Sequence, residues 1–293
     1  PVGSTSGGAV AIALGVSGIT VGTETGGSTR IPGAFTGITG FKPTQDSISR
    51  KGALVLSTSL DSVGLMAKDV KHCKLGFETM RDKTTLQPYD SNINNIKIIV
   101  PKNFGFVNID EKVEEGFEAA KNKIIESGFD VIESNIPLLD KYQKVPLWQF
   151  AAVESQAEYF EAFTSKKNLI DPNVSRRMDR ANQVTAVEYV KLCEERKKLI
   201  DQFNNFLGNN FLLLPTVSII PPLIKDCENE EFYDKVNLIS LKNTTLSNYM
   251  NGCSLSLPYT KDDMPIGIML NASNNHDDRL LKIGSKIEKI LSK

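Results

Sequence analysis

The sequence predicts an α/β protein, in which helices cover a β-sheet. Two short aliphatic runs, residues 96–100 and 129–132, are typical of buried strands. Apolar residues recur at helical spacing in the segment between them, at Val113, Phe117, Ala120 and Ile124. Gly128 then ends this helix. A strand, a helix and a second strand in this order are typical of an α/β sheet with helical cover.

Length and composition are those of an ordinary globular protein. The 293 residues are 40% hydrophobic and 24% charged, which is enough apolar material for one large domain or two modest ones. Lys and Arg (34) nearly balance Asp and Glu (35), and no basic cluster stands out, so we expect no direct binding to nucleic acid. No apolar run approaches the roughly 20 residues that cross a bilayer, so we expect no membrane partner.

The cysteines indicate neither a disulfide framework nor a metal site. They lie far apart and form no Cys-x-x-Cys pair: Cys73, Cys193, Cys227 and Cys253. We expect reduced thiols in a cytoplasmic protein that uses no metal and no cofactor. His72 and His276 are the only histidines. If the protein performs serine chemistry, a histidine is therefore not the natural base.

The N-terminal elements follow from local patterns. Residues 9–14 are uncharged and come after a cluster of hydroxyl residues, which predicts a buried helix capped by a hydroxyl. Residues 19–21 are β-branched and predict a short buried strand. Residues 37–64 are rich in turn residues and are expected to be loops. Residues 69–79 have the spacing of a short helix, and residues 80–95 are expected to be a surface connection.

The C-terminal half is predicted to contain long helices and a few buried strands. Residues 148–207 should be helical, with a capping box formed by Thr185 and Glu188. One apolar face of this region consists of Tyr189, Leu192, Leu199, Phe203 and Phe206. Strands are predicted over residues 211–215, 254–258 and 266–270, followed by a basic helix over residues 277–293.

The most distinctive stretch is residues 22–32, where a serine follows two glycines. Glycine has no Cβ, so the backbone can turn sharply and a substrate carbonyl can approach its amides. Ser28 is therefore the candidate nucleophile. The alternative is an ordinary glycine-rich turn with a capping serine. A second Gly/Ser cluster contains Ser4, which lies 24 positions earlier.

Three stretches together, residues 1–9, 22–32 and 37–44, closely resemble the amidase signature family, in the same order. The resemblance continues over residues 59–64 and, more loosely, over 213–216 and 265–269. It implies an α/β/α fold in which helices cover both faces of a mixed sheet. It also implies that residues 1–293 form a single amidase signature domain that lacks its N-terminal part.

The resemblance implies roles for individual residues. Ser28 would attack an amide carbonyl, and Ser4, held by a cis peptide, would relay a proton from a lysine. The oxyanion hole would consist of the backbone amides of Thr25, Gly26, Gly27 and Ser28. Fixed amides of this kind are worth about 10²–10³ in rate per donor. A cis bond at a residue other than proline costs about 3–4 kcal/mol, so packing must enforce it.

Mild departures from the family occur at Val2, Thr5 and Glu24, where Gly, Ser and Asp are usual. We interpret Glu24 and Arg30 as an ion pair that braces the nucleophile loop. The alternative is a plain surface pair.

The large departure concerns the lysine base. In the family it lies upstream of the first serine cluster, and this chain begins at Pro1 without such a segment, so we expect an N-terminally truncated member. A lysine base must lower its pKa from near 10.4 to about 7. Lys42 is the nearest lysine in sequence, but the resemblance gives it a structural role.

The predicted function is hydrolysis of a carboxylic amide C–N bond through a serine acyl-enzyme, with a small-molecule amide as substrate. Two alternatives remain: the glutaminase subunit of a tRNA-dependent amidotransferase, and a fragment without catalytic activity. Homodimer formation stays open. Residues 57–59 and 148–155 would contribute to acyl specificity, although Trp148 itself is expected to lie in the core.

Overall fold

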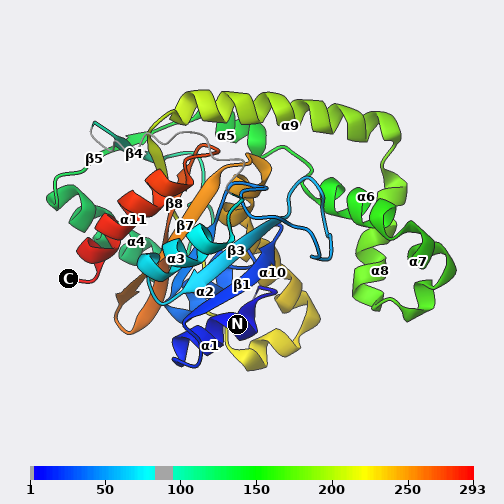
Figure 1. Cartoon of the computed structure of the whole chain (residues 1–293), viewed down its shortest axis with the longest axis horizontal. Helices are drawn as coiled ribbons and strands as arrows, with labels where there is room; N and C mark the ends of the chain where they lie inside the picture. The colour runs from blue at the N-terminus through cyan, green and yellow to red at the C-terminus, as the bar shows by residue number, and fades with distance from the viewer. Residues whose placement is uncertain (1–2, 83–94) are drawn as a thin grey trace.

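The computed structural model describes residues 3–82 and 95–293. Its centre is an eight-stranded sheet with helices on both faces (Figure 1). The strands lie in the order β1-β3-β2-β7-β8-β6-β4-β5. Their bounds are β1 Ile19–Glu24, β2 Thr39–Lys42, β3 Ser62–Ala67, β4 Lys97–Pro101, β5 Asp130–Ser134, β6 Phe211–Pro215, β7 Cys253–Lys261 and β8 Met264–Ala272.

The sheet is mixed, as predicted. From β1 across to β6 all neighbouring strands run antiparallel, whereas β4 is parallel to both β6 and β5. The central hairpin pairs β7 with β8 from Cys253 opposite Ala272 to Lys261 opposite Met264. The predicted strand, helix and strand between residues 96 and 134 form a parallel unit, in which α4 joins β4 to β5.

The α-helices vary from one short turn to six turns. Their bounds are α1 Ser6–Ala13, α2 Arg30–Thr36, α3 Val70–Met80, α4 Glu111–Glu126, α5 Pro137–Tyr142, α6 Trp148–Glu158, α7 Phe160–Ser165, α8 Pro172–Asp179, α9 Ala186–Leu207, α10 Glu230–Tyr249 and α11 Asp277–Leu291. Short 3-10 helices cover Lys167–Leu169, Arg180–Gln183 and Ile224–Glu228. The predicted capping box forms, since the Glu188 amide donates to Thr185 Oγ1 and the Thr185 amide donates to the Glu188 carboxylate.

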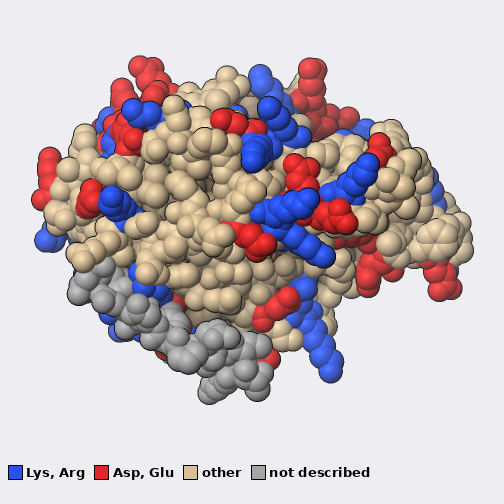
Figure 2. Space-filling model, turned by 90° about the horizontal axis from the view of Figure 1, so that it is seen from above, with Lys and Arg blue, Asp and Glu red and all other residues tan. Residues whose placement is uncertain are grey.

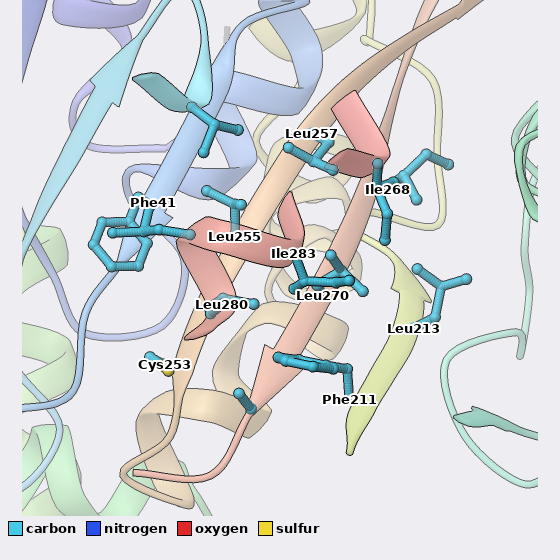
Figure 3. Packing of buried hydrophobic residues seen from close by; sticks show 14 of the residues in the cluster. Phe41, Phe211, Leu213, Cys253, Leu255, Leu257, Ile268, Leu270, Leu280 and Ile283 are labelled. Carbon is cyan, nitrogen blue, oxygen red and sulfur yellow. The ribbon is translucent and has the colours of Figure 1, made fainter. Parts of the chain in front are cut away.

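One face of the sheet is covered by α3, α4 and α11. Figure 3 shows Leu280 and Ile283 of α11 close to Leu255 and Leu270 of the central hairpin. Phe41 of β2 belongs to the same buried cluster. Burying large apolar side chains in this way is the dominant favourable contribution to folding.

The opposite face is covered by α5, α9 and α10. Leu212 of β6 and Met269 of β8 share a buried cluster with Phe203 of α9 and Tyr249 of α10. Two buried clusters of apolar residues, one on each side of the sheet, make the three-layer α/β/α fold that the sequence predicts.

The loop prediction for residues 37–64 was wrong in part, because β2 and the start of β3 lie within it. Glycines there resemble turn signals in the sequence, but they stand in strands where another backbone or side chain comes close. A Cβ on Gly40 would lie 2.9 Å from Arg30 Cα, and one on Gly64 would lie 2.8 Å from Thr29 Oγ1. These glycines let the sheet pack directly against the nucleophile loop.

The first helix and strand are less buried than predicted. Leu14, directly after α1, is 73% exposed, and Val21 of β1 is 47% exposed because β1 is an edge strand. Thr5 precedes α1 but makes no side-chain cap hydrogen bond. The predicted connection over residues 80–95 lies mostly outside the described residues.

Charges of both signs are interspersed over the face of the molecule that Figure 2 shows. This agrees with the balanced composition and gives no single-sign surface on that face. Within the described part of the chain, none of the helices is both long and apolar enough to cross a membrane.

Replacing Gly40 with alanine should destabilise the protein. The new methyl group would push against the backbone of Thr29 and Arg30, which cannot yield as a flexible side chain can. We expect Gly40→Ala to lower the free energy of unfolding by about 1–3 kcal/mol in urea titrations. Gly18→Ala is the matched control, because nothing lies within 4 Å of its added Cβ. Equal stability of the two variants would contradict the close approach.

Candidate functional site

A cleft of about 860 Å³ contains both candidate serines. Ser4 and Ser28 line it together with Thr25 and Gly26. Side chains of α6, α8 and α10 form other parts of its wall. Two Gly/Ser clusters that are separate in the sequence therefore meet at one cavity.

The nucleophile loop runs from the end of β1 at Glu24 to the start of α2 at Arg30. Gly27 is buried in this loop with a φ of +145°, which favours glycine. A Cβ there would lie 2.3 Å from Thr244 Oγ1 and 2.6 Å from Ile31 Cδ1. The loop can pass between α10 and α2 only because this residue has no side chain.

The backbone amides of the loop are available as donors. Among the described residues, none of the amides of residues 25–28 donates a hydrogen bond to a backbone or side-chain acceptor. The next amides along the chain are satisfied, since Ile31 N donates to Gly27 O at 2.8 Å and Gly33 N donates to Thr29 O at 3.2 Å. A run of unused donors beside a hydroxyl is the arrangement that a developing oxyanion needs.

The two serines differ in their surroundings. Ser28 is half-buried and Ser4 is exposed, and within the described ranges neither hydroxyl has a hydrogen-bond partner. The cis peptide expected at Ser4 is absent, because all peptide bonds of the described residues are trans. An exposed residue has no packing around it that could enforce the unfavourable isomer.

Glu24 and Arg30 form an ion pair that is fully buried, not a surface pair. Arg30 Nε donates to Glu24 Oε1 at 2.7 Å, and its Nη2 also contacts that oxygen. Thr29 Oγ1 donates to the other carboxylate oxygen, and Asn248 Oδ1 accepts from Arg30 Nη2 at 2.8 Å. Each charge therefore has several polar partners, as burial of charges requires.

Helix α10, which positions the loop, was not predicted from the sequence. Thr244 Oγ1 and Thr245 Oγ1 both donate to the carbonyl of Gly26. Asn248 Nδ2 donates to Glu24 O and to Leu60 O, both at 3.1 Å. The signal was polar residues at helical spacing, since Thr244 and Asn248 are four apart on one buried face. A polar helix face of this kind predicts no apolar packing, so the hydrophobic pattern alone did not reveal it.

A second set of polar contacts holds the other side of the loop. Thr25 Oγ1 donates to Asp61 Oδ1 at 2.5 Å, and Asp61 Oδ2 accepts from the amides of Leu56 and Ser57. Glu154 of α6 contacts the hydroxyls of Ser57 and Ser59 in turn. The segment 56–61 thus connects α6 to the nucleophile loop.

Lys42 does not line the cleft. Its ammonium is fully buried and donates to Pro43 O at 3.0 Å and to Gly252 O at 2.8 Å. Burial, followed by the nearby Arg30 charge, lowers its pKa to about 8. These carbonyl contacts are those of a structural lysine.

Two residues of the cleft wall were not anticipated. Trp148 was expected in the core, but it lines the cleft, with Arg180 Cζ 4.0 Å from its ring centroid. Lys242 of α10 also lines the cleft. A lysine that far along the chain could be connected with the serines only through the fold.

Removing one member of the buried ion pair should be strongly destabilising. Arg30→Met leaves the Glu24 carboxylate buried without its cation, and we expect the free energy of unfolding to fall by about 3–5 kcal/mol in urea titrations. The double variant Glu24→Gln, Arg30→Met should recover part of that loss. Glu115→Gln, which breaks the exposed pair with Lys261, is the control and should change little. A small effect of Arg30→Met would show that the pair does not brace the loop.

Lys42 should make stability depend on alkaline pH. Its folded pKa of about 8 lies below the ordinary value of 10.5, so between these pH values the unfolded chain binds more protons. The contribution of Lys42 to the free energy of unfolding should therefore rise with pH over this window, by on the order of 3 kcal/mol. The measurement is the difference between wild type and Lys42→Met at a series of pH values. A difference that stays flat from pH 8 to 10.5 would refute the lowered pKa.

Comparison with known proteins agrees with this geometry. The family described as Amidase matches residues 1–281. The chain is 29% identical to 2-amino-5-chloromuconic acid deaminase of Comamonas testosteroni, over 99% of this chain and 64% of that protein. It is also 29% identical to one subunit of the glutamyl-tRNA(Gln) amidotransferase of Treponema denticola, over 98% of this chain and 68% of that one.

Solved structures show the same fold. A crystal structure of an amidase superposes with a TM-score of 0.83 at 27% identity, and the alignment covers 99% of this chain and 66% of that one. The corresponding amidotransferase subunit from Thermotoga maritima gives a TM-score of 0.79 at 24% identity, which is a likeness of fold alone, over 98% of this chain and 65% of that one. The chain thus spans about two thirds of the length of these proteins. It belongs to the amidase signature family.

Proposed function

We propose that this chain carries the nucleophile and the oxyanion-binding amides of an enzyme that hydrolyses a carboxylic amide through a serine acyl-enzyme. The observation that carries the proposal is the run of unused amides at residues 25–28, beside Ser28 in a cleft that also contains Ser4. A turn that merely caps a helix would use such amides internally. Membership of the amidase family supports the same reaction class.

The proposed reaction has two stages. Ser28 Oγ attacks the carbonyl carbon and gives up its proton through Ser4, while the amides of residues 25–28 stabilise the oxyanion. The C–N bond then breaks, and ammonia or an amine leaves with the relayed proton. Water next attacks the acyl-enzyme, which releases the carboxylic acid and returns the proton to Ser28.

The initial base is assigned to a lysine outside this chain, as the family resemblance implies. Lys42 has other contacts, because its ammonium is engaged by two backbone carbonyls in the core. The proposal extends to a cytoplasmic setting, which the four free cysteines suit, and to a small-molecule amide as substrate. Whether two copies associate is left to measurement.

The relatives favour a second candidate function. Several are the same subunit of glutamyl-tRNA(Gln) amidotransferases, in which case this protein would release ammonia from glutamine for a partner. Purification with a stoichiometric second subunit, or glutaminase activity that requires one, would favour this candidate over a stand-alone amidase.

Labelling with a fluorophosphonate probe tests the proposed nucleophile. In the protein expressed from its natural reading frame, we expect covalent labelling of Ser28, which mass spectrometry of the peptide locates. Ser28→Ala should abolish labelling, and Ser4→Ala should slow it by about 10²–10⁴-fold because the proton relay is lost. Ser17→Ala is the control, since Ser17 lies outside the cleft and binds Ile19 O.

The 293-residue chain labelled alone separates the remaining alternative. Unlabelled Ser28 in both proteins, each correctly folded, would contradict the proposal and favour a fragment without catalytic activity. Fast labelling in the 293-residue chain would show that a base is already present in it.

A further inference from the structure

The cleft that contains Ser28 carries charge of one sign only. Arg177 of α8 and Lys242 of α10 line it, and no Asp or Glu among the described residues does so. The chain as a whole has a formal net charge of −1, so this is a local property of the cleft. A cavity lined by one sign of charge raises the local concentration of ligands of the opposite sign.

The two cations are not equivalent. Arg177 is 59% exposed and already has a carboxylate nearby, because Asp234 Oδ1 lies 3.9 Å from its Nη2. Lys242 is half-buried, and within residues 3–82 and 95–293 no carboxylate lies within 4.0 Å of its ammonium. Lys242 is therefore the uncompensated charge in the cleft, and an anionic ligand group would supply its missing partner.

Lys242 is held close to the oxyanion loop by its neighbours on α10. Thr245 Oγ1 donates to Gly26 O at 3.2 Å, and Leu241 Cδ2 lies 3.1 Å from the position that a Cβ on Gly26 would take. Both residues are within one helical turn of Lys242. The backbone that carries the cation is thus fixed relative to the amides that would hold the substrate carbonyl.

Apolar side chains line the same cleft. They are Ile31, Leu56, Leu60, Leu147, Trp148 and Leu238. A substrate that is polar throughout would lose hydration against these surfaces without compensation. A short hydrocarbon chain between two polar ends suits them better.

We propose that the acyl part of the substrate ends in a carboxylate, which binds the Lys242 ammonium while the amide carbonyl lies at the loop. The substrate class is then the monoamide of a short dicarboxylic acid. This inference rests on the proposed function, since it takes Ser28 as the site of attack. It adds a specificity-determining residue that acts on the far end of the substrate and takes no part in proton transfer.

Matched pairs of amides test the inference. For succinamate, glutaramate and adipamate against butyramide, valeramide and hexanamide, we expect kcat/KM to favour the charged member of at least one pair by about 10-fold or more. Lys242→Met should lower kcat/KM about 10- to 100-fold for the charged amide and leave the neutral amide nearly unchanged. Lys235→Met on the exposed side of the same helix is the matched control and should change neither.

Lys242→Arg separates charge recognition from proton transfer. Arginine keeps the cation but cannot act as a base, so it should retain much of the preference for the charged amide. Equal loss for charged and neutral amides in both Lys242→Met and Lys242→Arg would overturn the inference and make Lys242 a base or a structural residue. Equal kcat/KM for the charged and neutral members of every pair in wild type would also overturn it.

A binding measurement distinguishes failure of this inference from failure of the proposed function. Glutarate and adipate should bind in calorimetry and slow fluorophosphonate labelling of Ser28, and Lys242→Met should weaken both effects. If Ser28 does not label but the dicarboxylates bind through Lys242, the anion site stands and the proposed nucleophile fails. If Ser28 labels and none of the dicarboxylates binds, the inference about Lys242 fails alone.

Discussion

The buried ion pair between Glu24 and Arg30 is the interaction on which the nucleophile loop depends. Two charges removed from water are tolerated only when each finds its counter-charge and further hydrogen bonds. Arg30 meets this condition with the Glu24 carboxylate, Asn248 of α10, Ser254 of β7 and Met269 of β8. One guanidinium therefore joins the loop to three elements from the other end of the chain. The sharp turn at Gly27 persists because both of its ends are held in this way.

The sequence was sufficient for the regular parts of the fold. The parallel unit of β4, α4 and β5 follows from apolar runs and a helical repeat, and the hairpin of β7 and β8 follows from two β-rich segments. In these elements the residues that face the core are apolar, so the periodicity in the sequence is the periodicity of burial. The signals fail where that link breaks. β2 and β3 contain Gly40 and Gly64 for close packing, and glycine in a sequence looks the same whether it serves a turn or a tight contact.

The candidate site was predictable only in its local half. The Gly/Ser clusters lie within the first 32 residues, so their motif and the pairing of Glu24 with Arg30 could be proposed from the sequence. The other half comes from α6, α8 and α10, which lie more than 100 positions away. Asn248 and Lys242 carry no local motif, because an asparagine or a lysine in a helix is ordinarily a solvated residue. Only their position beside the loop gives them significance.

Helix α10 divides its residues between these two tasks, and the division follows from helical geometry. Thr244, Thr245 and Asn248 contact the loop, whereas Leu238 and Lys242, four residues apart, line the cleft. A substitution on the cleft side can change what the cavity binds while the hydrogen bonds to Gly26 and Glu24 stay in place. A shift of the whole helix would alter both, because the same backbone carries both sets of side chains. The oxyanion amides and the substrate-facing wall are thus mechanically coupled, although their side chains can vary independently.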